Sequence, residues 1–88
     1  MRQNPQFVLC DVAGNHVLMP VGSAAIDLNG MLSLNDTGVV IWEKLKCDMT
    51  FDELLTAILE EYNVSEEVAR ADLTRYLKTM RDVNAIVD

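Results

Sequence analysis

The first third of the chain contains short apolar runs separated by turn residues, a pattern typical of β-strands. Residues 7–12 (FVLCDV) and 16–21 (HVLMPV) are rich in apolar and β-branched side chains, and residues 13–15 (AGN) supply a turn between them. The pattern predicts a β-hairpin. Pro20 cannot donate a ladder hydrogen bond, so we expect it at a strand end or at a sheet edge.

Beyond Gly22 the pattern is less regular, and it leaves one segment open. Residues 24–28 fit a short strand, a loop or a helical turn equally well. Asn29-Gly30 follows, a pair that tolerates the positive φ angles of a type I′ turn. Residues 31–34 (MLSL) then predict another short strand.

The rest of the chain has apolar residues at helical spacing. Asn35 or Asp36 is suited to cap a first helix over 37–46, and Thr50 with Glu53 forms a capping box for a second helix. Ser65 caps the third, whose acidic first turn suits the helix dipole. The second and third helices repeat apolar side chains with a period of about 3.6 residues, at Leu54, Leu55, Ile58, Leu59, Tyr62, Ala69, Leu73, Tyr76, Leu77 and Met80. Val83, Ala85 and Ile86 form a final apolar tail.

Strands followed by helices indicate an α+β fold with a winged-helix-like arrangement. We predict a small N-terminal antiparallel sheet of three to four strands followed by three helices. The 88 residues suit one compact domain spanning 1–88, and the 50% hydrophobic content is enough for a modest core. Trp42, one turn into the first helix, is expected to anchor that core.

The charge balance disfavours nucleic acid as a partner. The formal net charge is −7, from 14 acidic and 7 basic residues, and such a surface repels phosphate backbones. The last helix does carry cations, but acidic residues dilute them, and the middle helix has four acidic residues and no basic one. We therefore expect no nucleic-acid partner, and a winged-helix DNA-binding or regulatory domain stands as the alternative function.

No catalytic constellation is evident in the sequence. His16 is the single histidine, Cys10 is expected to be a small buried residue, and only Lys44 and Lys46 lie near Cys47 in the sequence. Two cysteines and one histidine cannot complete a four-ligand zinc site without carboxylates. We therefore expect no catalytic residues, no metal and no enzymatic activity. A small-molecule carrier is a further alternative, but Ser33 and Ser65 lack the motif expected around a modified serine.

No export signal begins the chain, and no apolar run approaches the roughly 20 residues of a membrane span. A cytoplasmic protein with reduced thiols and no membrane partner is the expectation.

A short sheet followed by a helix offers a binding site that needs no catalytic residue, because an extended peptide can pair with the free edge and place side chains beside the helix. Apolar edge strands can also dimerise, so a homodimer is compatible with the sequence.

The sequence resembles the PqqD-like family across nearly its whole length. The resemblance rests on the order and spacing of several short motifs, since each alone is weak. These are VLMPVG at 17–22, LNDTG at 34–38, IWE at 41–43 with Leu45, Thr50 with Glu53-Leu54, EYNV at 61–64 and VARADLTRYL at 68–77.

The resemblance implies a RiPP recognition element, which binds the leader of a ribosomally made precursor peptide and presents it to a modifying enzyme, often a radical SAM protein. In that family the leader pairs with the strand before the first helix and lies against the third helix. It implies no metal or cofactor of the chain's own. The peptide-binding positions carried over are Met31, Leu32, Ser33 and Leu34 on the strand, and Asp72, Arg75, Tyr76 and Thr79 on the helix.

Two details of that carry-over stay open. Leu73, Leu77 and Met80 are expected to face the core instead of the groove. If the segment before Asn29 forms its own strand, the edge that receives the peptide would be residues 25–28 instead of 31–34.

Overall fold

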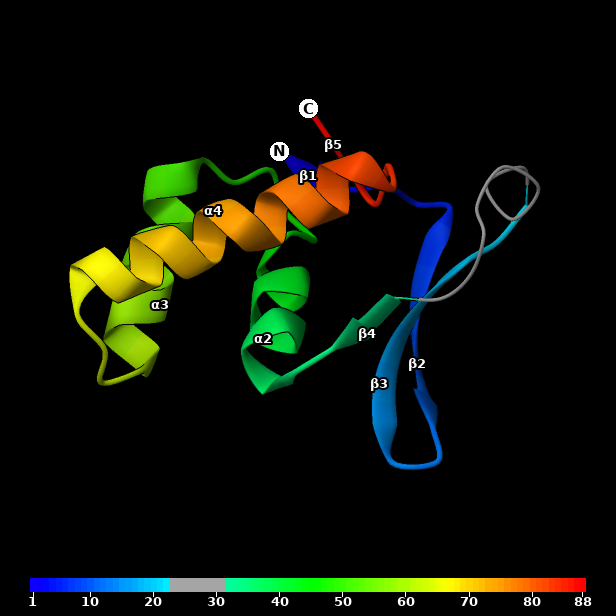
Figure 1. The fold of residues 1–88 in the computed structure, drawn as a ribbon. Helices are drawn as coiled ribbons and strands as arrows, with labels where there is room; N and C mark the ends of the chain where they lie inside the picture. The colour runs from blue at the N-terminus through cyan, green and yellow to red at the C-terminus, as the bar shows by residue number, and fades with distance from the viewer. Residues whose placement is uncertain (23–31) are drawn as a thin grey trace.

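The computed structural model describes residues 1–22 and 32–88, and the expected hairpin lies near its N-terminus (Figure 1). Strands β2 (Phe7–Val12) and β3 (Asn15–Pro20) pair antiparallel. Ala13 and Gly14 form the turn with φ angles of 53° and 83°, which fits the type I′ turn that matches the twist of paired strands. The turn needs only two residues, so β3 begins one residue earlier than predicted.

Strand β4 (Leu32–Leu34) joins β3 antiparallel and gives a three-stranded sheet in the order β2-β3-β4. A second, two-stranded sheet pairs β1 (Arg2–Gln3) with β5 (Ile86–Val87). The sequence pattern did not predict β1 or β5 as strands. The expected strand residue Met31 and the open segment 24–30 lie outside the described residues.

Three helices follow among the described residues, α2 (Asp36–Lys44), α3 (Phe51–Glu61) and α4 (Glu66–Asp82). Asn35 is the N-cap of α2, and the capping box of α3 is complete with both of its hydrogen bonds. The Ser65 hydroxyl accepts from Val68 N at 3.2 Å at the start of α4. Helix α2 ends two residues earlier than predicted, with Leu45 as its C-cap.

A left-handed residue ends α4 and turns the chain back into β5. Asn84 has φ 63°, its N–H donates to Arg81 O at 3.0 Å, and Ala85 N donates to Met80 O at 2.8 Å. These two bonds form a Schellman motif, for which asparagine is the usual substitute for glycine. The reversal brings the end of the chain beside its beginning, as Figure 1 shows.

The N-terminal segment ties the end of α2 to this reversal. Gln3 N donates to Leu45 O at 2.9 Å, and the Gln3 side chain donates to Trp42 O at 2.7 Å. Asn4 N donates to Ala85 O at 2.8 Å. The first four residues therefore connect two elements that are distant in the sequence.

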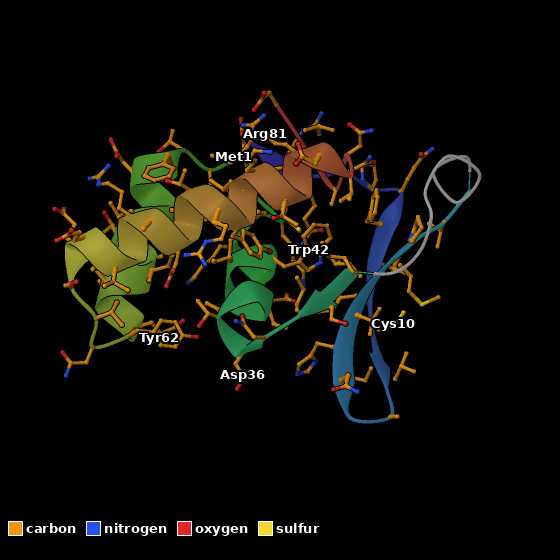
Figure 2. All side chains as sticks on the ribbon, in the orientation of Figure 1. Met1, Cys10, Asp36, Trp42, Tyr62 and Arg81 are labelled. Atoms are coloured by element: carbon orange, nitrogen blue, oxygen red, sulfur yellow. The ribbon has the colours of Figure 1, made fainter. Side chains whose placement is uncertain are left out.

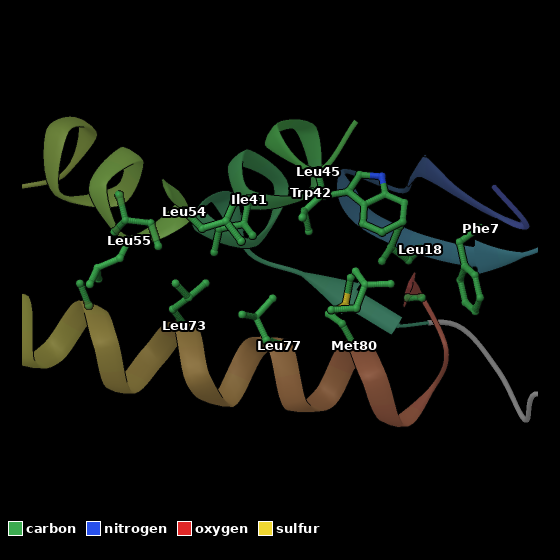
Figure 3. Close-up of a cluster of buried hydrophobic side chains, with 14 residues drawn as sticks. Phe7, Leu18, Ile41, Trp42, Leu45, Leu54, Leu55, Leu73, Leu77 and Met80 are labelled. Atoms are coloured by element: carbon green, nitrogen blue, oxygen red, sulfur yellow. The ribbon is translucent and has the colours of Figure 1, made fainter. Parts of the chain in front are cut away.

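Helix α4 packs across α2 and α3 to form the core, to which the sheet adds Phe7 and Leu18 (Figure 3). Trp42 is 2% exposed, which confirms its prediction as a core anchor. Leu73, Leu77 and Met80 are buried as expected, whereas Cys10 is only half-buried. Within the described residues, no helix is long and apolar enough to cross a membrane.

Candidate peptide-binding site

A cavity of about 410 Å³ lies between β4 and α4, and the start of α2 and the α3–α4 connection complete its wall. Seven of the eight residues carried over from the family line it. They are Leu32, Ser33 and Leu34 on the strand, and Asp72, Arg75, Tyr76 and Thr79 on the helix. The fold therefore brings the two predicted groups of residues together around one hollow. Met31, the eighth residue, lies outside the described residues.

The pairing of β2 with β3 determines where the main-chain groups of the sheet point. Val12 and Asn15 close a two-residue hairpin, so they form a hydrogen-bonded pair, and such pairs alternate along an antiparallel ladder. The bond from Val21 N to Gln6 O, at 2.7 Å, continues the same alternation past the other end of the strands. By this alternation the N–H and C=O of Val17 point toward β2.

The same alternation leaves one residue of β4 with main-chain groups that no other described strand pairs with. The two neighbours of Val17 on β3 point toward β4, where they pair with Leu32 and Leu34. Ser33, opposite Val17, therefore directs its N–H and C=O away from β3, toward the open edge of the sheet. This donor and acceptor stand at the border of the cavity, which Ser33 also lines.

Tyr76 forms the inner wall of the cavity and is fixed against α2. Its hydroxyl donates to Gly38 O at 2.9 Å, and burial raises the pKa of the phenol. A Cβ atom on Gly38 would lie 3.3 Å from Tyr76 Cε2 and 3.4 Å from Leu34 Cβ. Glycine at the end of the LNDTG segment therefore lets the helix, the tyrosine and the strand approach closely.

An ion pair stands at the outer border of the cavity. Arg75 Nη2 lies 2.8 Å from Asp72 Oδ1, and the two side chains are 72% and 63% exposed. An ion pair this exposed adds little to stability. The guanidinium has five N–H donors, so Arg75 can bind an incoming acceptor while it keeps its contact with Asp72.

The sequence profile of a known family covers most of the chain. The profile described as coenzyme PQQ synthesis protein D (PqqD) matches residues 15–86. The chain belongs to the PqqD family. No curated protein sequence matches it.

Two solved structures share the fold of this PqqD-family chain. The first is described as TbiB1 in complex with the TbiA(beta) leader peptide; it is 21% identical, with a TM-score of 0.75 and full coverage of both chains. The second is described as lasso peptide synthetase B1 complexed with the leader peptide. It is 20% identical, with a TM-score of 0.70, and the match covers 96% of this chain and 92% of that one.

The far end of the cavity is apolar, and its composition was not predicted. This end is lined by Ile58 of α3, by Tyr62 and Val64 of the connection that follows it, and by Ala69 and Leu73 of α4. Val64 is 43% exposed, so its side chain is accessible to a ligand in the cavity. In the sequence these residues follow the helical period or end a helix, and only the packing of α3 on α4 shows that they share a hollow.

The other candidate side chains lie apart from this PqqD-family cavity. His16 Nδ1 pairs with Asp11 Oδ1 at 2.7 Å across the hairpin, and Cys47 is exposed in the α2–α3 connection. Figure 2 places Cys10 on the hairpin, away from the helices. Within residues 1–22 and 32–88 there is no group of three His, Cys, Asp or Glu residues that could hold a metal ion.

Proposed function

We propose that this chain is a non-catalytic peptide chaperone that binds the leader of a ribosomally synthesised precursor peptide and presents it to a modifying enzyme, of the radical SAM class. The observation that carries the proposal is the position of the free Ser33 N–H and C=O directly beside the cavity. A strand added there gains main-chain hydrogen bonds from the edge and side-chain selection from the cavity. Membership of the PqqD family and the leader complexes formed by two proteins of the same fold support it.

The sheet geometry specifies which leader side chains are selected. Side chains alternate between the two faces of a sheet, and directly opposed residues share a face. Leu32 and Leu34 pack against the core and line the cavity, whereas the exposed Ser33 side chain lies on the opposite face. The leader residue opposite Ser33 therefore points away from the cavity, and its two neighbours point into it. Those two neighbours should be large and apolar.

The charges on α4 favour a peptide partner over DNA. Each cation of this helix lies within ion-pair distance of a carboxylate, in the pairs Arg70–Glu66, Arg75–Asp72, Lys78–Asp82 and Arg81–Asp88. A recognition helix needs cations that are available to phosphates and side chains that reach base edges.

A calorimetric titration tests the proposal, with the leader and the core segments of the precursor peptide encoded beside this chain's gene as separate ligands. We expect the leader to bind at one site per chain and the core segment not to bind. Ser33→Pro removes the free N–H and should abolish most of the affinity, and Ser33→Ala is its matched control because it keeps the main chain intact. Leader binding that is equal in both variants would refute strand addition at β4.

A second measurement separates presentation from catalysis. The precursor peptide incubated with this chain alone should keep its mass, and the modifying enzyme should act faster when the chain is present. A mass change produced by the chain alone would overturn the non-catalytic assignment.

A further inference from the structure

The opposite edge of the same sheet is longer and lies away from the cavity. Strand β2 has six residues against three in β4, and it is the other outer strand of the order β2-β3-β4. Val8, Cys10 and Val12 pair with β3, so by the same alternation Leu9 and Asp11 direct their N–H and C=O groups outward. No other strand of residues 1–22 and 32–88 pairs with this edge, so within that part of the chain it offers two donors and two acceptors for another strand.

The residues of strand β2 itself carry few of the features that protect an edge from pairing. Natural edge strands are blocked by lysine, proline, bulges or inward-pointing charges. Residues 7–12 (FVLCDV) contain neither lysine nor proline, and the single charge, Asp11, already pairs with His16 at 2.7 Å. Val8 and Val12 are 40% and 46% exposed, and they lie on the same face as the half-buried Cys10.

We propose that a second copy of the chain binds this edge, with the two β2 strands antiparallel about a two-fold axis at Cys10. The pattern Val8-x-Cys10-x-Val12 reads the same in both directions, so this register places Val8 opposite the second copy's Val12 and Cys10 opposite the second copy's Cys10. It also pairs the outward groups of Leu9 with those of the second copy's Asp11. Both exposed valines of each copy then gain an apolar cross-strand partner.

The neighbouring registers are less favourable. An axis at Asp11 sets two carboxylates directly opposite each other, which is destabilising. An axis at Leu9 leaves Val12 without an opposing residue in β2, because β2 begins at Phe7. The axis at Cys10 alone satisfies the outward groups, pairs the valines and keeps the carboxylates apart.

The interface is small, so the dimer is weak. One strand edge with two valine pairs buries less than the roughly 1,200–2,000 Å² of a stable complex. A net charge of −7 on each copy adds repulsion, which salt screens. Pairing at β2 makes a continuous six-stranded sheet with β4 at each end, so both cavities stay open.

Sedimentation of the full chain between about 10 µM and about 1 mM tests the proposal, since a weak dimer populates in that range. We expect the average mass to rise toward a dimer with concentration and to rise further with added salt. Asp11→Pro removes an outward N–H that does not serve β3 and should keep the chain monomeric, whereas Asp11→Ala should dimerise at least as well as the unmodified chain. A monomer at every concentration, or a dimer unaffected by Asp11→Pro, would overturn the proposal.

Oxidative cross-linking tests the register. Opposed residues of a non-hydrogen-bonded pair have Cα atoms about 4.5 Å apart, within disulfide range. Diamide accepts the two electrons and two protons that a pair of thiols loses, and it becomes the hydrazine. The Cys47→Ser variant, which keeps Cys10, should form a disulfide dimer faster than Cys10→Ser, although Cys47 is the more exposed thiol. The reverse order of rates would exclude the axis at Cys10.

Discussion

The two outer strands of one sheet differ in what lies beside them. The edge of β4 is three residues long and borders the cavity, while the edge of β2 is six residues long and none of its residues lines that cavity. Main-chain hydrogen bonds provide affinity that does not depend on sequence, and selection requires pockets for side chains. We therefore expect the shorter edge to be the selective one, and the longer edge to choose a partner only through its own pattern of side chains.

The largest effect comes from removing the core that both edges share. Trp42 is 2% exposed and packs among α2, α4 and the sheet (Figure 3). Trp42→Ala should lower the free energy of unfolding by about 3–5 kcal/mol, a large part of the stability of a small domain. Leader binding and dimerisation should then both fail. Chemical denaturation measures the loss, with Val68→Ala at a 50% exposed position as a control that changes stability by less than about 0.5 kcal/mol.

A pair of proline variants should separate the two edges. Ser33→Pro should weaken leader binding about 10-fold or more, since it removes a main-chain donor worth about 0.5–1.5 kcal/mol and displaces the added strand. Its dimerisation should be unchanged. Asp11→Pro should leave leader binding unchanged in calorimetry and should prevent dimerisation in sedimentation. If either proline impaired both activities while the chain stayed folded, the edges would not be independent.

The contact between Tyr76 and Gly38 should contribute less. Tyr76→Phe removes one hydrogen bond to the Gly38 carbonyl, which should lower the free energy of unfolding by about 0.5–1.5 kcal/mol. Leader affinity should also fall, because the ring is then held less firmly against α2 in the cavity wall. Dimerisation should not change, because Tyr76 lies on the cavity side.

The buried phenol of Tyr76 should make the free energy of unfolding fall at alkaline pH. Burial raises the pKa of its phenol above the usual value of about 10, so the folded chain holds this proton more tightly than the unfolded chain. The stability that the protonated phenol gives the folded chain is fully present below about pH 10 and is lost as the pH rises above that value. Denaturation curves of the unmodified chain should lose stability there more steeply than those of Tyr76→Phe. Parallel pH profiles would contradict the assignment.

The smallest effect is expected at the outer border of the cavity. Arg75→Ala should leave the free energy of unfolding within about 1 kcal/mol, because its ion pair with Asp72 is exposed. Leader affinity should fall a few-fold through the loss of guanidinium donors. Lys78→Ala is the matched control, since Lys78 is an equally exposed, ion-paired residue of α4 that does not line the cavity. Equal affinity losses in both variants would indicate a general charge effect.

Local signals in the sequence predicted most of the fold. The hairpin turn at residues 13–15, the asparagine, threonine and serine caps and the helical period each depend on residues within a few positions of one another. The type I′ conformation of Ala13 and Gly14 was not predicted, since such a turn was expected at Asn29-Gly30, outside the described residues. Strands β1 and β5 escaped prediction because two-residue strands have no measurable period. They pair Arg2 with Val87 across the whole chain, through a reversal that depends on Asn84.

The candidate site was predictable to the extent that it lies on single elements. Asp72, Arg75, Tyr76 and Thr79 follow the spacing of one helix face, and the resemblance identified that face. Tyr62 and Val64 were not predicted, since their place in the cavity depends on how α3 packs on α4. The free Ser33 groups follow from the register of three strands, which no single strand encodes.

Hydrogen exchange at the Ser33 amide tests the central claim most directly. The amide should exchange quickly in the free chain and become strongly protected at saturating leader peptide. The amides of Leu9 and Asp11 should not change at concentrations where the chain is monomeric. If Ser33 stayed unprotected in the saturated complex, or if protection appeared at Leu9 and Asp11 instead, the leader would not be adding its strand to β4.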